Sequence, residues 1–273
     1  MEEKPQQIED WMEMIANQEV KPDIIQDLLP DGIATMLIAG RPGVGKTNFV
    51  LQLGLSIANG VPFLGFRCQQ KKILYLTFEG IPQKLSDRLK KQMPNFDRAN
   101  DGMFSIFMSP PRKLGLFNEE YREIAQSVDI IIIDPLRWMV DGDYCKPMDM
   151  AEFTRKLRMF EDETKTSMIL VHHPKKPGGF TGRSDPSDMN ELKGATELMD
   201  AAQSIVVLAE RKGSERKRGE KDFVNKKTLY MPKTRDALQD LPPINLFFDR
   251  DKCMFVSEEL GFDYLDSEGE YPF

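Results

Sequence analysis

The chain has 273 residues, of which 40% are hydrophobic and 30% charged, a composition typical of a globular protein with a sizeable core. Its 37 Lys and Arg against 44 Asp and Glu give a net charge of −7, which argues mildly against a polybasic nucleic-acid binder. No apolar run can span a bilayer, the acidic first residues do not resemble a signal peptide, and three separated cysteines suit a reducing compartment, so we expect a cytoplasmic protein.

The first 31 residues form an acidic segment with nine acids and two lysines. Within it Ile8, Trp11, Met12 and Ile15 recur at helical spacing, which predicts a short amphipathic helix. We expect its apolar stripe to pack on the chain's own core, with a neighbouring subunit as the alternative. This N-terminal segment, residues 1–31, precedes the predicted core of residues 32–256.

Apolar runs that suit strands then alternate with amphipathic runs that suit helices. Such alternation indicates an α/β fold with a mostly parallel central sheet. The run at 128–133 is almost entirely apolar and β-branched, as expected for a strand buried on both faces. The predicted strands are residues 33–39, 73–78, 105–108, 128–133, 168–171 and 205–208, and the predicted helices are 47–58, 85–91 and 150–160.

The C-terminal part has a different pattern. Residues 228–231, 244–248 and 254–257 resemble strands joined by short connections, which predicts an antiparallel extension at the edge of the sheet. Two long polar loops, 174–193 and 211–227, interrupt the core, and an acidic tail, residues 257–273, follows it. The two acidic ends account for the negative total, because residues 32–256 carry a net charge of +6. The total therefore does not exclude nucleic-acid binding.

A glycine-rich turn between the first strand and the first core helix matches the phosphate-loop pattern G-x-x-x-x-G-K-[ST]. Backbone N–H groups of such a loop point at phosphate oxygens, and the helix N-terminus adds a favourable dipole. The lysine neutralises the β- and γ-phosphates, and the following hydroxyl binds Mg²⁺. We therefore predict an ATP and Mg²⁺ site made of Gly40, Arg41, Pro42, Gly43, Val44, Gly45, Lys46 and Thr47.

Two carboxylates end predicted strands at the edge where a parallel sheet binds ligands. Asp134 follows the run of isoleucines and is predicted to bind Mg²⁺ through water, with a helix-capping role as the alternative. Glu79 follows the second strand and is predicted to orient and deprotonate the water that attacks ATP. An exposed glutamate at a strand end is the alternative for Glu79. The pattern N-K-x-D is absent, which disfavours GTP.

His172 and His173 follow the fifth strand and are the only histidines. Adjacent residues of an extended chain point in opposite directions, so the pair cannot readily share a zinc ion. We expect one imidazole to face the γ-phosphate as a sensor, and the alternation does not say which.

Lys233 and Arg235 lie two residues apart after a predicted strand and therefore share a face. They are candidates for a finger that reaches a neighbouring subunit's phosphate and stabilises charge in the transition state. A solvated basic strand end explains the same spacing.

The ordered set of motifs resembles the RecA-like ATPases, and most closely the RepA-type hexameric replicative helicases. The similarity runs from about residue 28 to residue 235 and includes the phosphate loop, a glutamate after the second strand, I-I-I-I-D-P, and H-H-x-x-K after the fifth strand. It implies a RecA-like P-loop NTPase core that forms a ring with ATP at subunit interfaces. It also implies that Glu79 is the catalytic glutamate, Asp134 the metal-binding aspartate, His173 the sensor, and Lys233 and Arg235 the finger pair.

The resemblance places the family's two DNA-binding loops at 136–149 and 174–193. We expect single-stranded DNA contacts from Arg137, Lys175, Lys176 and Arg183. The predicted function is that of a Mg²⁺-dependent ATPase, either a ring-forming DNA helicase or a DNA-dependent ATPase of replication or recombination. A recombination mediator or regulatory ATPase that binds a protein partner is the alternative. A small-molecule kinase is disfavoured, because no lid with paired arginines is evident.

Overall fold

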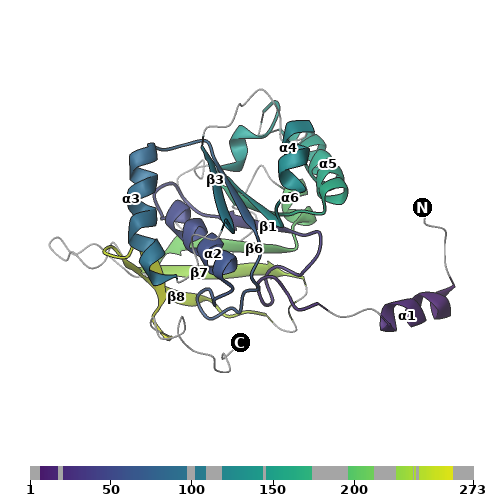
Figure 1. Ribbon diagram of the computed structural model, residues 1–273, viewed down its shortest axis with the longest axis horizontal. Helices are drawn as coiled ribbons and strands as arrows, with labels where there is room; N and C mark the ends of the chain where they lie inside the picture. The colour runs from purple at the N-terminus through teal and green to yellow at the C-terminus, as the bar shows by residue number, and fades with distance from the viewer. Residues whose placement is uncertain are drawn as a thin grey trace, which may run out of the picture.

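The computed structural model describes residues 7–17, 21–96, 102–108, 119–143, 146–173, 196–211, 226–235, 237 and 240–260. Within these ranges the chain forms a nine-stranded sheet in the order β3-β2-β4-β5-β1-β6-β7-β8-β9 (Figure 1). The strands from β3 to β6 pair in parallel, and β7, β8 and β9 continue the sheet antiparallel beyond β6. The predicted α/β fold and its antiparallel C-terminal extension are both confirmed.

The observed elements begin and end close to the predicted ones. The strands are β1 (Thr35–Ala39), β2 (Ile73–Thr77), β3 (Phe104–Met108), β4 (Ile130–Asp134), β5 (Ser167–His172), β6 (Ser204–Glu210), β7 (Lys226–Thr234), β8 (Ile244–Asp249) and β9 (Met254–Ser257). The helices are α1 (Ile8–Ala16), α2 (Lys46–Asn59), α3 (Pro82–Gln92), α4 (Glu119–Ala125), α5 (Pro147–Thr164) and α6 (Thr196–Ala201), with short 3-10 turns η1 (Met93–Asn95) and η3 (Leu136–Trp138).

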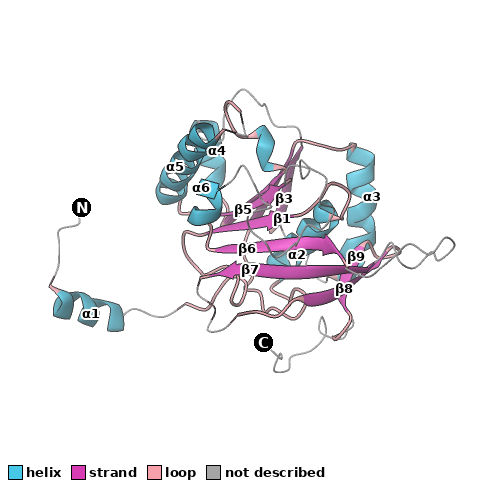
Figure 2. Cartoon of the chain, turned by 180° about the vertical axis from the view of Figure 1, so that it is seen from behind, coloured by secondary structure: helices cyan, strands magenta, loops and turns pink. Residues whose placement is uncertain are grey.

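Two hydrophobic layers enclose the central strands. Side chains of alternate residues point to opposite faces of a strand, so Met36 and Ile38 of β1 join one layer while Leu37 and Ala39 join the other. Helices α2 and α3 contribute to the first layer, and α4, α5 and α6 contribute to the second. Figure 2 shows the two groups of helices on either side of the sheet. This burial on both faces explains why the central strands are continuous apolar runs.

Helix α1 confirms the predicted amphipathic helix but not its predicted packing. Figure 1 shows α1 away from the body of the chain. Ile8 and Met12, two members of the predicted stripe, are 65% and 59% exposed, so these two residues do not pack on the core. The helical pattern predicts which side chains share a face, and it contains no information about what covers that face. Within the described ranges, no helix is long and apolar enough to cross a bilayer.

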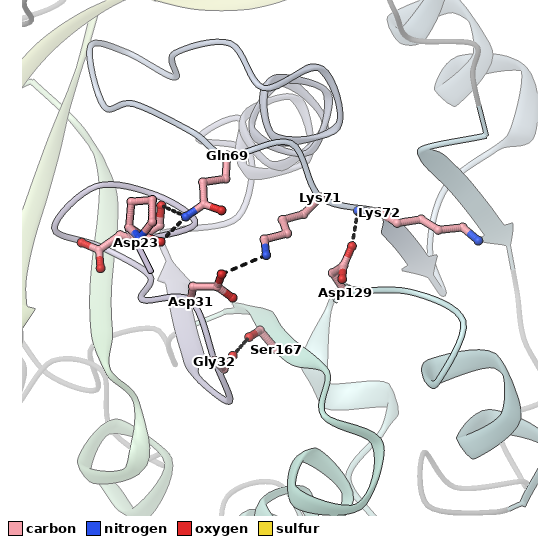
Figure 3. Close-up of polar contacts among 9 residues, drawn as sticks. Asp23, Asp31, Gly32, Gln69, Lys71, Lys72, Asp129 and Ser167 are labelled. Carbon is pink, nitrogen blue, oxygen red and sulfur yellow. Dashed lines mark hydrogen bonds and ion pairs between the residues drawn. The ribbon is translucent and has the colours of Figure 1, made fainter. Parts of the chain in front are cut away.

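Polar contacts connect the segments at the amino ends of the central strands (Figure 3). The Lys71 ammonium lies 3.1 Å from the Asp31 carboxylate, which joins the segments that precede β2 and β1. Asp129 accepts a 2.7 Å hydrogen bond from the backbone N–H of Lys72, and Ser167 donates one to the carbonyl of residue 32. These contacts are at the edge opposite the carboxyl ends of the same strands.

Candidate nucleotide-binding site

The predicted site residues follow the carboxyl ends of four adjacent strands. Gly40 follows β1, Glu79 lies two residues after the end of β2, Asp134 ends β4, and His173 follows β5. The strand order β2-β4-β5-β1 places these four ends side by side. Ligands of open α/β sheets bind at this edge. The topology therefore brings together groups that are far apart in the sequence.

The backbone of the phosphate loop requires glycine at several positions. Gly43 and Gly45 have φ angles of +82° and +111°, a region that residues with a side chain rarely adopt. A Cβ at Gly40 would lie 2.5 Å from the carbonyl oxygen of Leu208 on β6, so only glycine fits there without a shift of the backbone. The loop ends at α2, which begins at Lys46 and presents its N-terminal N–H groups.

Lys46 is almost fully buried beneath this loop. Its Nζ donates hydrogen bonds of 2.6 and 3.0 Å to the carbonyl oxygens of Gly40 and Arg41. Burial lowers the pKa of Lys46 to about 8, and the negative charges of Asp134 and Glu79 oppose that shift. The ammonium remains the predominant form at neutral pH, and such a group suits the charge of a nucleotide phosphate.

Asp134 is buried at the end of β4 and contacts side chains of strand β2 and helix α2. One carboxylate oxygen accepts hydrogen bonds of 2.9 Å from the Thr47 hydroxyl and 2.8 Å from the Tyr75 hydroxyl. Burial raises the pKa of Asp134, while the hydrogen bonds from Tyr75 and Thr47 and the charge of Lys46 partly offset that rise. Thr47 and Asp134 thus present a hydroxyl and a carboxylate oxygen at one place, and such oxygen ligands suit Mg²⁺.

The described residues contain no group of three or more His, Cys, Asp or Glu side chains that could hold a metal by themselves.

Glu79 is bound by two residues of the turn that follows Asp134. Its Oε1 accepts a hydrogen bond of 3.0 Å from the indole N–H of Trp138 and forms an ion pair with Arg137. Partial burial raises the pKa of Glu79, but these two hydrogen bonds and the charge of Arg137 outweigh it, and the net shift is downward. The candidate base therefore contacts the predicted DNA-binding residue Arg137.

The two histidines differ in their surroundings. His172 is fully buried at the end of β5, and burial lowers its pKa to about 3. His173 is half-buried, and burial lowers its pKa to about 4, assisted by the charge of Lys46 and opposed by that of Glu79. Both imidazoles are neutral at pH 7, and His173 is the one whose electrostatic neighbours include Lys46, Glu79 and Arg137.

Lys233 and Arg235 lie elsewhere. The Cα of Lys233 pairs with that of Ile205, near the amino end of β6, at the edge opposite the phosphate loop. Its Nζ donates hydrogen bonds of 2.6 and 3.1 Å to the carbonyl oxygens of Met199 and Asp200 at the end of α6, and Arg235 also donates to Asp200. The pair therefore shares a face, as predicted, but does not reach the phosphate loop of its own chain.

Three predicted DNA contacts, Lys175, Lys176 and Arg183, lie outside the described residues. Most of the 211–227 loop and residues 261–273 of the acidic tail also lie outside them.

Sequence reasoning missed the role of Tyr75. A tyrosine in the middle of a buried strand needs a partner for its hydroxyl, and the neighbouring strand β4 ends in an aspartate. The buried tyrosine was the signal in the sequence, and the pairing of β2 with β4 identifies Asp134 as its partner.

Gln52 and Phe255 support the phosphate loop, and sequence reasoning missed them as well. Gln52 of α2 donates a 2.9 Å hydrogen bond to the carbonyl of Phe255 and accepts one of 2.7 Å from its N–H. The Phe255 ring packs against the loop, because a Cβ at Gly45 would lie 2.8 Å from its Cζ. A buried glutamine in α2 was the available signal, since a buried amide requires partners.

Comparisons with known proteins identify the family and the fold. The protein-family profile described as "AAA domain" matches residues 2–179. A KaiC-like protein of the archaeon Pyrococcus horikoshii superposes with a TM-score of 0.56 at 16% identity, covering 82% of this chain and 88% of that protein. A DnaB-like replicative helicase, solved in a study of its interactions with primase, gives 0.65 at 14% identity, covering 93% and 68%. No curated protein matches the chain significantly. At these identities the two structures show the fold, which is the one predicted from the motifs.

Proposed function

This chain belongs to the AAA domain family and is a P-loop ATPase of the RecA-like fold, and on that premise we propose that it is a Mg²⁺-dependent, DNA-stimulated ATPase that forms a hexameric ring and acts as a DNA helicase. The observation that carries the proposal is the convergence of Lys46, Thr47, Glu79 and Asp134 at the carboxyl ends of adjacent parallel strands.

Each of these residues has a part that its surroundings support. Lys46 and the loop N–H groups bind the nucleotide phosphates, and Thr47 and Asp134 hold Mg²⁺, which neutralises phosphate charge when bound. Glu79 accepts the proton of the attacking water. His173, neutral at pH 7, lies close enough to Lys46 and Glu79 for their charges to shift its pKa, and it acts as the phosphate sensor.

The position of Lys233 and Arg235 supports action in trans. Both are at the edge of the sheet opposite their own phosphate loop, so a phosphate that they contact belongs to a neighbouring chain. An arginine supplied from a neighbouring subunit stabilises transition-state charge and makes turnover depend on assembly. This is the basis for proposing a ring with ATP at the subunit interfaces.

Single-stranded DNA is the proposed activator. Arg137 and Trp138 provide a guanidinium and an aromatic ring beside the site, and the sequence that follows β5 adds the positive charges of Lys175, Lys176 and Arg183. Guanidinium and ammonium groups bind phosphates, and aromatic rings stack on bases. Residues 32–256 carry a net charge of +6, because the excess of acidic residues lies at the two ends of the sequence. A positive charge favours binding of single-stranded DNA.

The deciding experiment measures ATP turnover with and without a dT oligonucleotide at several salt concentrations. We expect stimulation that weakens steeply as salt rises, because bound phosphates release counterions. Lys46→Ala should abolish turnover with and without DNA, whereas Lys84→Ala, which removes an exposed charge from α3, should change neither. The absence of stimulation at every salt concentration contradicts the proposal.

Mass photometry with ATP and Mg²⁺ tests the assembly. We expect a species of six copies of the 31.3 kDa chain, and a forked duplex should be unwound by it. Monomers or heterodimers that neither form rings nor unwind the fork would favour a mediator or regulatory ATPase that binds a protein partner.

A further inference from the structure

Arg137, Trp138 and Glu79 form a compact unit at the edge of the candidate site. The Arg137 guanidinium and the Trp138 indole N–H both contact Oε1 of Glu79, the indole at 3.0 Å. The guanidinium carbon lies 5.0 Å from the centre of the Trp138 ring, so the two donors also contact each other. Both donors belong to η3, the turn that begins two residues after Asp134.

These contacts leave Glu79 poorly suited to remove a proton. A general base works best when its lone pairs reach the water and its pKa lies near the working pH. Here one oxygen accepts from two donors, and the net effect of the surroundings lowers the pKa of Glu79. Glu79, the candidate base, is thus held in an ion pair with Arg137.

The same two donors have the chemistry that a single-stranded nucleic acid binds. A guanidinium forms bidentate contacts with a phosphate, and an indole ring stacks on a base. The side chains of Arg137 and Glu79 are 48% and 40% exposed, so a strand can reach the ion pair from solvent. A phosphate that takes Arg137 competes directly with the Glu79 carboxylate.

We propose that Arg137 and Trp138 are positioning residues that withhold Glu79 from the attacking water until a single-stranded nucleic acid binds them and releases the carboxylate. This rests on the proposed function, because it requires Glu79 as the base and a nucleic acid as the activator. It deepens that function by naming the contact through which the activator acts. The charges of Glu79, Arg137 and Lys46 all influence the pKa of His173.

Turnover of matched variants tests the proposal. Arg137→Gln and Trp138→Phe each remove one donor to Glu79, and we expect turnover without DNA to rise by roughly tenfold, the scale of one hydrogen bond to a charged group. Stimulation by a dT oligonucleotide should shrink accordingly. Arg137→Lys, which keeps the charge, should restore part of the restraint. Arg155→Gln breaks an exposed ion pair with Glu152 on α5 and should leave both rates unchanged.

Two other results overturn the proposal. A fall in DNA-free turnover in Arg137→Gln and Trp138→Phe means that the donors hold Glu79 in its productive position. An unchanged DNA-free rate with lost stimulation means that Arg137 and Trp138 are DNA contacts without an effect on Glu79.

A fluorescence readout separates this inference from the proposed function. The chain has two tryptophans, so Trp11→Phe leaves Trp138 as the reporter. In that background a dT oligonucleotide should shift Trp138 emission, and Glu79→Ala should shift it without DNA. If both shifts occur but DNA never stimulates turnover, the proposed function fails while the contact stands. If DNA stimulates turnover but leaves Trp138 emission unchanged, the inference alone is wrong.

Discussion

The hydroxyl of Thr47 donates a 2.9 Å hydrogen bond to the carboxylate of Asp134, although 87 residues separate the two in the sequence. Thr47 is the second residue of α2 and Asp134 is the last residue of β4, and the strand order β4-β5-β1 brings them together. The Tyr75 hydroxyl contacts the same oxygen at 2.8 Å. The two candidate Mg²⁺ ligands are thus oriented by their own contacts, and the tyrosine is part of that arrangement.

Tyr75→Phe should weaken the response to Mg²⁺. The substitution keeps a buried ring but removes one donor that orients Asp134, and loss of such an outer partner typically weakens metal binding by about 10- to 100-fold. We expect the Mg²⁺ concentration for half-maximal turnover to rise by roughly tenfold. A Mg²⁺ titration of ATPase activity measures it. Tyr230→Phe on β7 is the matched control, and the same midpoint in both variants would exclude this role for Tyr75.

Glu79→Gln should bind ATP without hydrolysing it. The amide cannot accept the proton of the attacking water, and general-base catalysis contributes about 10²- to 10⁴-fold to a rate. Lys46→Ala should instead lose binding, because it removes the buried charge that we propose neutralises the nucleotide phosphates. Equilibrium binding of a fluorescent ATP analogue, measured beside turnover, distinguishes the two defects. Wild-type turnover in Glu79→Gln would refute the assignment.

Gly45→Ala should destabilise the chain more than Gly43→Ala. Both glycines have positive φ, which costs a residue with a side chain about 1 kcal/mol or more. The added Cβ would lie 2.8 Å from the Phe255 ring at Gly45 but would meet nothing within 4 Å at Gly43. Denaturant titrations measure the difference in the free energy of unfolding.

A double variant isolates the steric part of this effect. Phe255→Leu should reduce the cost of Gly45→Ala and leave that of Gly43→Ala unchanged. Equal costs in both backgrounds would mean that the ring does not restrict the loop.

Mixed assemblies should recover activity from two inactive variants. If Arg235 acts on a neighbour's nucleotide, Arg235→Ala chains still bind ATP and Lys46→Ala chains still supply the finger. Some interfaces of a mixture then combine an intact loop with an intact finger, and we expect partial turnover. Mixing Arg235→Ala with the double variant Lys46→Ala/Arg235→Ala is the control and should recover none. Equal turnover in the two mixtures would place Arg235 in its own subunit's reaction or outside it.

Glu161 should make stability depend on pH. It is fully buried, and burial raises its pKa to about 7, although Thr35 donates a 2.6 Å hydrogen bond and Arg158 lies 3.2 Å away. Between the ordinary pKa of 4.5 and about 7 the folded chain retains a proton that the unfolded chain releases. The contribution of Glu161 to the free energy of unfolding therefore falls as pH rises through that window.

Glu161→Gln removes this titration. Its stability relative to wild type should increase from pH 5 to pH 8 by roughly 3 kcal/mol, at about 1.4 kcal/mol per pKa unit. Denaturant titrations at each pH measure the difference in the free energy of unfolding between Glu161→Gln and wild type. The other titrating groups are the same in both chains, so their pH dependence cancels in this difference. Glu163→Gln, at an exposed position on the same helix, should run parallel to wild type. Parallel curves for Glu161→Gln would contradict the buried, protonated carboxyl.

The strands were predictable because their physical signal is strong. Residues 130–134 and 167–172 are buried on both faces, and continuous apolar runs follow directly from that burial. Helices α4 and α6 were not predicted, since they have seven and six residues and are too short to display a helical period.

The site was predictable only in part. The clustering of Lys46, Thr47, Glu79 and Asp134 follows from strand ends that share an edge, while their roles stay predictions. The contact between Glu79 and Arg137 spans 58 residues and depends on how the turn after β4 directs two side chains. No local pattern encodes that direction.

The packing of Phe255 against Gly45 has a consequence for biosynthesis. Gln52 and Phe255 are 203 residues apart, and nearly the whole chain must be synthesised before the last strand can support the loop. Nascent chains that lack this strand have the complete glycine-rich sequence but not the packing that shapes it. We therefore expect a chain truncated before β9 to bind nucleotide more weakly than a chain whose sheet includes that strand.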